Sequence, residues 1–366
     1  ARNAGSGRII ASNAKLFTAA AILSRYGTGG RFSTNIYADG SLADGTLTGD
    51  LYLRGGGDPL FGNASFVTTN FGSRATLELL AQNLEDAGVK KVTGSIFGDE
   101  SVFDARRGTV YSGFARNGDI GGALGGLMVN KGFVRGRWQA NPPAFAAQRL
   151  RAALKAVGIA VTSKTGIAKT PTTAKRLAYV RSLPASALVR QMNKPSNNYL
   201  AEMLAKALAM PTSAADDDED GGLVPLGNTS ATTASGSSVS RRHAASFGSR
   251  VRLADGSGLS RSDVAAPREV VDLLRGVQKT PAFTDFKASL PIAGVDGTLA
   301  PRMRRGSAYR KCSGKTGTLS NVSSLSGYCT TAGGDTVAFS ILQNRVSPAA
   351  ARAQQDRVAA QLAALN

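Results

Sequence analysis

The stretch that decides the fold runs from residue 313 to residue 343, SGKTGTLSNVSSLSGYCTTAGGDTVAFSILQ, and a helical pattern follows it over residues 347–365. It contains three strand-like runs, at 314–319, 325–331 and 336–343, which are separated by short turn-like segments. Short connections favour neighbouring antiparallel strands. Three consecutive hairpin-like strands and a helix therefore predict an α+β fold, with an antiparallel sheet flanked by helices.

Two cysteines flank the first two of these strands. If the strands form a simple hairpin, Cys312 and Cys329 face each other directly across it. An oxidising compartment would then allow a disulfide that braces the strand carrying Lys315. Two buried free thiols are an equally weighted alternative.

The rest of the chain adds further helices and strands. Helical runs are predicted near 12–26, 75–87, 143–157, 185–209 and 267–279, and strand-like runs near 48–53 and 92–97. The acidic and Ser/Thr-rich stretch 216–238 is predicted to be an exposed loop. This stretch begins like a calcium loop but lacks the bidentate Glu, so neither a metal nor any other cofactor is predicted.

Ser12 begins a helix-forming run, and it is the only serine that has a lysine, Lys15, three residues later. This spacing places both side chains on one face of the first turn, where free N–H groups and the helix dipole favour negative charge. A lysine serves as a general base only if its pKa falls well below about 10.4, through burial or a second cation. Lys315 is a candidate for that cation. A serine at a helix start is, by itself, usually an N-cap.

Two further short patterns occur twice, and their context selects one copy of each. Ser-x-Asn occurs at Ser33 and at Ser196, but only Ser196, with Asn198, precedes a helix-forming run. Lys-Thr-Gly occurs at 164–166 and again from Lys315, but only Lys315 begins a strand of the C-terminal sheet. We therefore select Ser196, Asn198 and Lys315.

The order Ser-x-x-Lys, Ser-x-Asn, Lys-Thr-Gly resembles the signature shared by penicillin-binding proteins and serine β-lactamases. The surrounding sequence resembles one branch, the D-Ala-D-Ala carboxypeptidase/endopeptidase family of class C low-molecular-mass penicillin-binding proteins. The segments that carry this resemblance lie at 11–18, 49–59, 98–104, 255–260 and 313–318. The resemblance implies a transpeptidase/β-lactamase-like domain with an insert between the first two motifs.

The resemblance also implies an activity. The expected enzyme is a serine-type DD-peptidase that cleaves the D-Ala-D-Ala bond of peptidoglycan stem peptides, with the D-Ala-diamino acid cross-link as a second substrate, and that β-lactam antibiotics acylate. Ser12 would attack and Lys15 would accept its proton. Ser196 would relay a proton to the leaving amine, and Asn198 would hold Lys15 and the substrate backbone.

The resemblance places the substrate contacts on the third motif and on scattered residues. Lys315, Thr316, Gly317 and Thr318 would bind the end of the substrate that carries the carboxylate, and the N–H groups of Ser12 and Thr318 would form the oxyanion hole. The substrate side chain would contact four further residues, Asp99, Phe103, Leu259 and Leu319.

The resemblance further implies a domain division. Residues 1–60 and 185–366 would form the penicillin-binding transpeptidase-like domain, and residues 61–184 the inserted region. Relatives with two full inserts have more chain between the first two motifs, so we expect one insert to be lost or reduced, between residues 132 and 141. Relatives usually also have a segment before Ser12 that joins the main sheet, so we expect the native start to be missing or processed.

Two other functions share these motifs. A serine β-lactamase would need a fast deacylation base, and the Glu-x-x-Leu-Asn arrangement of one β-lactamase class is absent. A noncatalytic cell-wall-binding pseudoenzyme would not be labelled by penicillin. The single histidine, His243, lies in a Ser/Arg-rich stretch and is a poor base for a Ser-His-Asp triad.

The net charge of +19 predicts attraction to polyanions. Aromatic residues make up 6% of the chain and no zinc-ligand spacing occurs, so no specific nucleic acid partner is expected. Anionic cell-wall polymers and a merely solvated surface are equally weighted explanations. No apolar run reaches the length of a membrane-spanning helix. The expected location is extracytoplasmic: secreted, periplasmic or associated with the cell wall.

Overall fold

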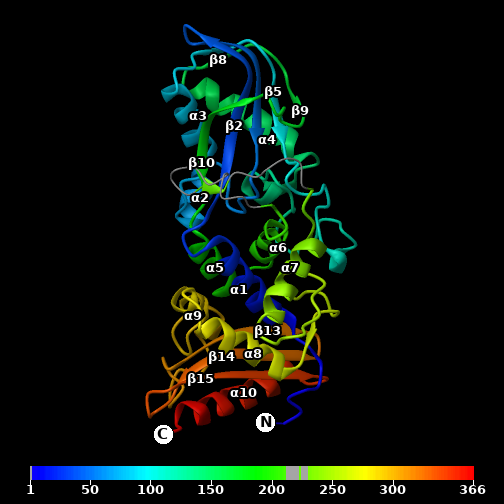
Figure 1. Cartoon of the computed structure of the whole chain (residues 1–366), viewed down its shortest axis with the longest axis vertical. Coiled ribbons are helices and arrows are strands. Elements are labelled where there is room, and N and C mark those ends of the chain that lie inside the picture. The colour runs from blue at the N-terminus through cyan, green and yellow to red at the C-terminus, as the bar shows by residue number, and fades with distance from the viewer. Residues whose placement is uncertain (1, 212–221, 224–229) are drawn as a thin grey trace.

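The computed structural model describes residues 2–211, 222–223 and 230–366. Figure 1 shows an elongated molecule: a sheet with helices lies at one end, a group of helices fills the middle, and a second sheet with helices lies at the other end. Both termini lie at that second end. None of the helices formed by the described residues has both the length and the apolar character needed to span a bilayer.

The C-terminal sheet is a three-stranded antiparallel meander of β13 (Cys312–Leu319), β14 (Val322–Thr330) and β15 (Thr336–Asn344). Helix α8 (Pro267–Gln278) lies on one side of it and α10 (Pro348–Ala363) on the other (Figure 1). Cys312 is paired with Cys329 across the hairpin, and the two form a disulfide. The predicted strands and the α+β class are confirmed, and of the two alternatives for the cysteines the structure has the disulfide.

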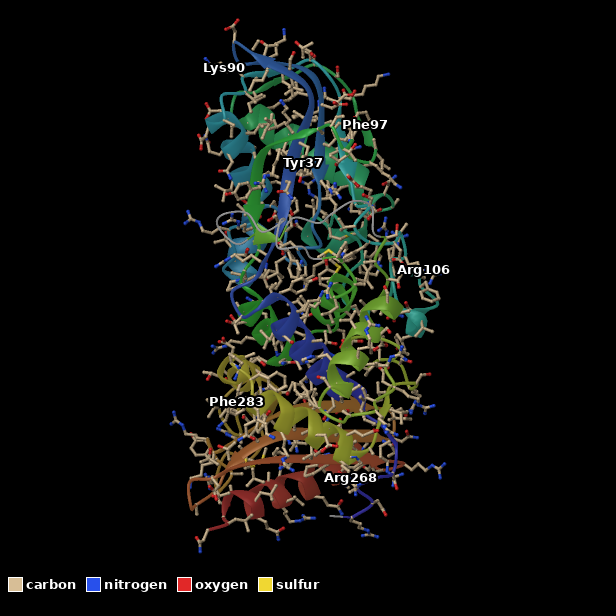
Figure 2. The ribbon with its side chains drawn as sticks, in the orientation of Figure 1. Tyr37, Lys90, Phe97, Arg106, Arg268 and Phe283 are labelled. Carbon is tan, nitrogen blue, oxygen red and sulfur yellow. A yellow bond between two sulfur atoms is a disulfide. The ribbon has the colours of Figure 1, made fainter. Side chains whose placement is uncertain are left out.

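The middle of the molecule is helical. It contains α1 (Ala14–Tyr26), α5 (Ala185–Asn193), α6 (Asn198–Ala207), α7 (Thr233–Ala245) and α9 (Phe283–Ser289). Helix α1 is buried along its length except at Ser24 and Arg25, so it forms the centre of this core. Phe283, labelled in Figure 2, makes an edge-to-face contact with Tyr328 of β14 at 5.3 Å between ring centroids. This contact joins the helical core to the C-terminal sheet.

Three predicted elements differ from the structure. The strand-like run 92–97 is two short strands, β4 (Lys91–Val92) and β5 (Ile96–Asp99). The helical run 185–209 is two helices, because Ser196 takes a left-handed φ of +61° that no helix continues. Residues 233–238, predicted as exposed loop, lie in α7, where Thr232 and Ser235 form a capping box. Ser/Thr residues therefore start a helix there. The parts of that predicted loop at 216–221 and 224–229, with the calcium-loop-like sequence, lie outside the described residues.

The second sheet is mixed. Its strands are β2 (Arg31–Ala43), β3 (Thr46–Arg54), β4 (Lys91–Val92), β5 (Ile96–Asp99), β8 (Ala160–Val161), β9 (Thr165–Ile167), β10 (Lys175–Arg181) and β11 (Gly222–Leu223). β10, β2 and β3 pair antiparallel, whereas the pairs β3–β4, β3–β5, β4–β8, β5–β9 and β11–β2 are parallel. Helices α3 (Leu77–Asp86) and α4 (Pro142–Ala156) join these strands around a separate apolar core.

This sheet bears on the predicted domain boundaries. Strands β2 and β3 belong to the predicted segment 1–60, yet they pair with β10, β4 and β5 from the region 61–184. The chain therefore enters the second sheet at Arg31, well before residue 60, because strands that pair belong to one sheet. At the predicted shortening, a two-stranded hairpin of β6 (Phe133–Val134) and β7 (Arg137–Trp138) precedes α4.

Short elements complete the chain and anchor its start. They are β1 (Arg8–Ile9), η1 (Ala11–Asn13), α2 (Ala64–Phe71), η2 (Val110–Ser112), η3 (Asn130–Gly132), β12 (Val264–Ala265) and η5 (Gly297–Leu299). β1 pairs with β12, and the Asn344 side chain accepts from Ile9 N at 2.8 Å and donates to Ile9 O at 3.0 Å. The segment before η1 is thus tied to the end of β15, which places η1 beside the C-terminal sheet.

Candidate active site

Ser12 and Lys15 are in contact where η1 runs into α1. Lys15 Nζ donates to Ser12 Oγ at 3.0 Å, to Asn198 Oδ1 at 2.7 Å and to the carbonyl oxygen of Ser257 at 2.6 Å. An ammonium has three N–H donors, so every donor of this fully buried lysine has a partner. The arrangement fixes the lysine nitrogen beside a half-buried hydroxyl.

Burial is the main reason that the pKa of Lys15 is low. Desolvation lowers the pKa of Lys15 to about 8, and the carboxyl groups of Glu202, Asp255 and Asp263 oppose this effect. Lys315 was the expected second cation. In the structure burial dominates, and the charge of Lys15 instead helps to lower the pKa of Lys315. Lys15 can therefore release its proton near neutral pH.

A buried carboxyl group holds the segment that accepts the third Lys15 hydrogen bond. Glu202, on α6 and fully buried, accepts from the N–H groups of Gly256 at 3.2 Å and Ser257 at 2.8 Å. Asp255 accepts from Gly258 N at 2.7 Å. Sequence reasoning missed Glu202, although an acidic residue inside the apolar run Tyr199–Ala205 was a detectable signal.

Ser196 and Lys315 form a second contact beside the first. Lys315 Nζ donates to Ser196 Oγ at 2.9 Å and to the carbonyl oxygen of Thr316 at 2.9 Å. Lys315 is fully buried, and burial followed by the nearby charge of Lys15 holds its pKa well below the usual range. The left-handed backbone of Ser196 lies in the break between α5 and α6, so this break places the hydroxyl beside β13.

Two glycines let other segments approach the Ser12 backbone closely. A Cβ on Gly258, whose φ is +84°, would lie 1.9 Å from the carbonyl oxygen of Ala11 and 2.9 Å from Ser12 N. A Cβ on Gly317 would lie 2.9 Å from the carbonyl oxygen of Ile10 and 3.0 Å from Ser12 N. The backbone N–H of Ser12 is therefore enclosed by the 255–260 segment on one side and β13 on the other.

Asn13 joins the first motif to the third. Its Nδ2 donates to the carbonyl oxygen of Lys315 at 3.0 Å and to Ser324 Oγ at 2.9 Å, and Ser324 Oγ donates to the carbonyl oxygen of Ile10 at 2.8 Å. Both side chains are buried. Sequence reasoning assigned no role to either residue, because these contacts join positions about 300 residues apart.

A cavity of about 590 Å³ opens over these groups. It is lined by Ser12, Ser196, Gly297, Thr298, Pro301, Arg302, Thr316, Gly317, Thr318 and Arg352. Thr316 Oγ1 donates to Thr298 Oγ1 at 2.7 Å, and Arg352 Nη2 donates to Thr318 Oγ1 at 3.2 Å. The η5 residues and the two arginines were not anticipated from the sequence. Within the described part of the chain, no group of three or more His, Cys, Asp or Glu residues could hold a metal.

The four residues expected around the substrate side chain do not line this cavity. Leu319 ends β13, and Leu259 packs against the helical core next to Gly258. Phe103 is buried, with its ring against Gly57, in the same core. Asp99 is buried at the end of β5, and its carboxylate accepts from Thr170 N at 2.8 Å, Thr170 Oγ1 at 2.7 Å and Ser101 N at 2.9 Å.

The rejected copies of the duplicated motifs lie elsewhere. Ser33 is a buried residue of β2, and Thr165 begins β9 directly after Lys164. Both strands belong to the second sheet. The copies chosen from context, Ser196 with Asn198 and Lys315 with Thr316, are the ones that the structure brings to Ser12 and Lys15.

For the acylation of Ser12 that the family resemblance implies, we expect Gly258→Ala to slow the rate by up to about 100-fold, because a collision with the carbonyl oxygen of Ala11 would shift the Ser12 turn by a substantial fraction of an ångström. The matched control is Gly248→Ala. Gly248 has nearly the same φ, +86°, but a Cβ there would meet nothing within 4 Å. The control should lose only about 1–2 kcal/mol of folding free energy through backbone strain. Equal acylation rates in the two variants, measured by stopped-flow penicillin binding, would refute the proposed crowding.

Comparison with known proteins identifies the class to which this fold and site belong. The sequence profile of the D-Ala-D-Ala carboxypeptidase 3 (S13) family matches residues 1–113 and 120–365. The chain is 30% identical to a D-alanyl-D-alanine carboxypeptidase of Actinomadura sp. (strain R39), over 99% of this chain and 78% of that protein. It is 26% identical to the D-alanyl-D-alanine carboxypeptidase DacB of Haemophilus influenzae, over 92% of this chain and 80% of that protein.

Solved structures show the same fold. Penicillin-binding protein 4 of Haemophilus influenzae superimposes with a TM-score of 0.79 at 22% identity, over 99% of this chain and 93% of that chain. A predatory peptidoglycan endopeptidase of Bdellovibrio bacteriovorus gives a TM-score of 0.59 at 15% identity, over 99% of this chain and 88% of that chain. The chain belongs to the D-Ala-D-Ala carboxypeptidase 3 (S13) family. The resemblance inferred from the three motifs, and the enzyme class that it implied, are confirmed.

Proposed function

We propose that this protein is a serine DD-peptidase whose nucleophile is Ser12 and whose general base is Lys15. One observation carries the proposal: the Ser12 hydroxyl lies 3.0 Å from a fully buried lysine nitrogen whose pKa burial lowers to about 8, and it faces a cavity shared with Ser196 and β13. Neutral Lys15 accepts the hydroxyl proton as Ser12 Oγ forms a bond to the carbonyl carbon of the D-Ala-D-Ala peptide.

The acylation step then needs a site for negative charge and a proton for the leaving group. The N–H groups of Ser12 and Thr318 stabilise the oxyanion, a role that the close approach of Gly317 and Gly258 to Ser12 N supports. Ser196, which accepts a hydrogen bond from Lys315, relays a proton to the amine of the departing D-alanine. Asn198 holds Lys15 in position through its 2.7 Å hydrogen bond.

The third motif binds the end of the substrate. Thr316 and Thr318 present hydroxyl groups to the cavity, Gly317 lets the backbone approach closely, and Lys315 lies directly behind. Water then attacks the acyl-enzyme, which releases the shortened stem peptide and restores Ser12. A β-lactam acylates Ser12 by the same attack. The proposal does not extend to Asp99 or Phe103, because internal contacts already bury both side chains away from the cavity.

We place the protein outside the cytoplasm, with peptidoglycan and the cross-links of its stem peptides as substrates. The Cys312–Cys329 disulfide supports this location, since such bonds persist in oxidising compartments. Positive charge would assist work among anionic wall polymers. Lys90 and Arg268, at opposite ends of the molecule in Figure 2, illustrate how widely this charge is spread.

The decisive experiment is covalent labelling. A fluorescent penicillin should label the protein, mass spectrometry should locate the adduct on the peptide that contains Ser12, and a diacetyl-L-Lys-D-Ala-D-Ala peptide should release D-alanine. Hydrolysis of nitrocefin at many turnovers per second would instead indicate a β-lactamase. A folded protein that forms no adduct would be a wall-binding pseudoenzyme.

A further inference from the structure

Besides Lys15, the proposed base, three cationic side chains lie at or directly behind the wall of the Ser12 cavity. Lys315 contacts two lining residues from behind, while Arg302 and Arg352 line the cavity themselves. A peptide ending in D-Ala-D-Ala carries a carboxylate, so the cation that meets it decides how strongly the site selects a charged chain end. The three side chains differ in burial and in partners.

Lys315 is poorly placed to bind the substrate carboxylate. Its side chain is completely buried, and its ammonium already donates to Ser196 Oγ and to the carbonyl oxygen of Thr316. Burial, together with the charge of Lys15, lowers the pKa of Lys315 well below the usual range, so its charged form is disfavoured relative to an exposed lysine. Lys315 therefore acts on Ser196 more directly than on a group in the cavity.

Arg302 is occupied by the protein. Its Nε and Nη2 donate to Asp356 Oδ1 at 3.0 and 2.6 Å, and Nη2 also donates to Gln355 Oε1 at 3.1 Å. Asp356 and Gln355 lie on α10, so this guanidinium fastens η5 and its neighbours to that helix. The carboxylate of Asp356 neutralises most of the charge that Arg302 would offer to a ligand.

Arg352 differs from both. It lies on α10, its side chain is exposed, and within the described residues no acidic side chain forms an ion pair with it. Its Nη2 donates to Thr318 Oγ1 at 3.2 Å. A hydroxyl that accepts a hydrogen bond keeps its own O–H free to donate, so Arg352 turns Thr318 into a donor toward the cavity. The remaining N–H groups of the guanidinium form a planar fork that matches a carboxylate.

We propose that Arg352 is the cationic residue that binds the terminal carboxylate of the substrate, together with the Thr318 hydroxyl. The carboxylate of a β-lactam would occupy the same position. This inference rests on the proposed function, since it specifies how the Ser12 site selects its substrate. It assigns the selection of substrates with a charged chain end to α10, a helix that carries none of the three motifs.

The test compares Arg352→Gln with Arg357→Gln, an exposed arginine on the same helix that does not line the cavity. The probes are diacetyl-L-Lys-D-Ala-D-Ala and its C-terminal amide, which lacks the charge. Arg352→Gln should lower kcat/KM for the acid by about tenfold or more and lower it much less for the amide, which loses only the orientation of Thr318, whereas Arg357→Gln should change neither. An unchanged rate for the acid, or equal losses for acid and amide, would overturn the assignment.

A binding measurement separates this inference from the proposed chemistry. In a Ser12→Ala background no acylation occurs, and calorimetry should show the acid peptide binding more weakly by a similar factor when Arg352 is also replaced. If the wild-type protein never acylates but this difference is found, the carboxylate site stands and the catalytic proposal fails. If acylation proceeds but the difference is absent, Arg352 has no such role.

Discussion

In the Ser12→Ala variant, covalent labelling by a fluorescent penicillin is expected to disappear completely, because the atom that would carry the acyl group has been removed. The fold should survive this change. Lys15 Nζ loses one of three acceptors but keeps Asn198 Oδ1 and the carbonyl oxygen of Ser257. The free energy of unfolding should therefore change by no more than about 1 kcal/mol.

The matched control for this variant is Ser24→Ala, since Ser24 lies on α1, the helix that directly follows Ser12, and is exposed. It should be labelled at the wild-type rate. Labelling would be followed by in-gel fluorescence, and folding by thermal unfolding. Persistent label in a folded Ser12→Ala protein would move the nucleophile to another residue and remove the basis of the proposed mechanism.

Replacing Lys15 by methionine is expected to slow acylation by about 10²- to 10⁴-fold, the usual contribution of a general base. Methionine fills much of the same buried volume but cannot accept a proton. It also leaves Asn198 Oδ1 and the carbonyl oxygen of Ser257 without the ammonium donor, so some loss of stability should accompany the slower rate.

The pH dependence distinguishes a base from a structural lysine. The neutral form of Lys15 is the active one, and burial lowers its pKa to about 8. The wild-type acylation rate should therefore rise about tenfold per pH unit below that value and level off above it. In Lys15→Met this rise should be absent. A variant that kept the wild-type profile at reduced rate would show that another group titrates.

The same low pKa has a consequence for stability. Between about pH 8 and the usual value of 10.5, the unfolded chain holds a proton on Lys15 that the folded chain has released. The contribution of Lys15 to stability therefore rises with pH across this window and is constant below it.

Local sequence was sufficient for the motifs and for the C-terminal meander. Lys15 follows Ser12 by one helical turn, and Cys312 and Cys329 face each other across one hairpin, so both contacts depend only on short-range geometry. Context also selected the copies of the duplicated motifs that the structure brings beside Ser12 and Lys15, because strand and helix patterns differ over a few residues. The family resemblance supplied the order in which these pieces belong together.

Contacts between segments that lie far apart in the chain could not be predicted from sequence patterns. Nothing in the periodicity of α10 indicates that Arg352 reaches Thr318, or that Asn13 reaches β13. The break at Ser196 was missed because its neighbours on both sides favour helix. Asp99 and Phe103 were predicted to contact the substrate by analogy with the flanking segments of the family. In the structure the Asp99 carboxylate accepts a hydrogen bond from Thr170 N, and the Phe103 ring lies against Gly57. Neither contact follows from the residues that neighbour Asp99 and Phe103 in the sequence.

The tie between Asn13 and Lys315 spans 302 residues, and Asn344 secures Ile9 across a still longer interval. During synthesis Ser12 therefore emerges about 300 residues before the strand that lies beside it. A chain that stops short of β13 cannot assemble the site, and one that stops short of α10 lacks Arg352. Reactivity toward penicillin would thus report that these two distant segments have met in a folded molecule, which makes the label a measure of folding as well as of chemistry.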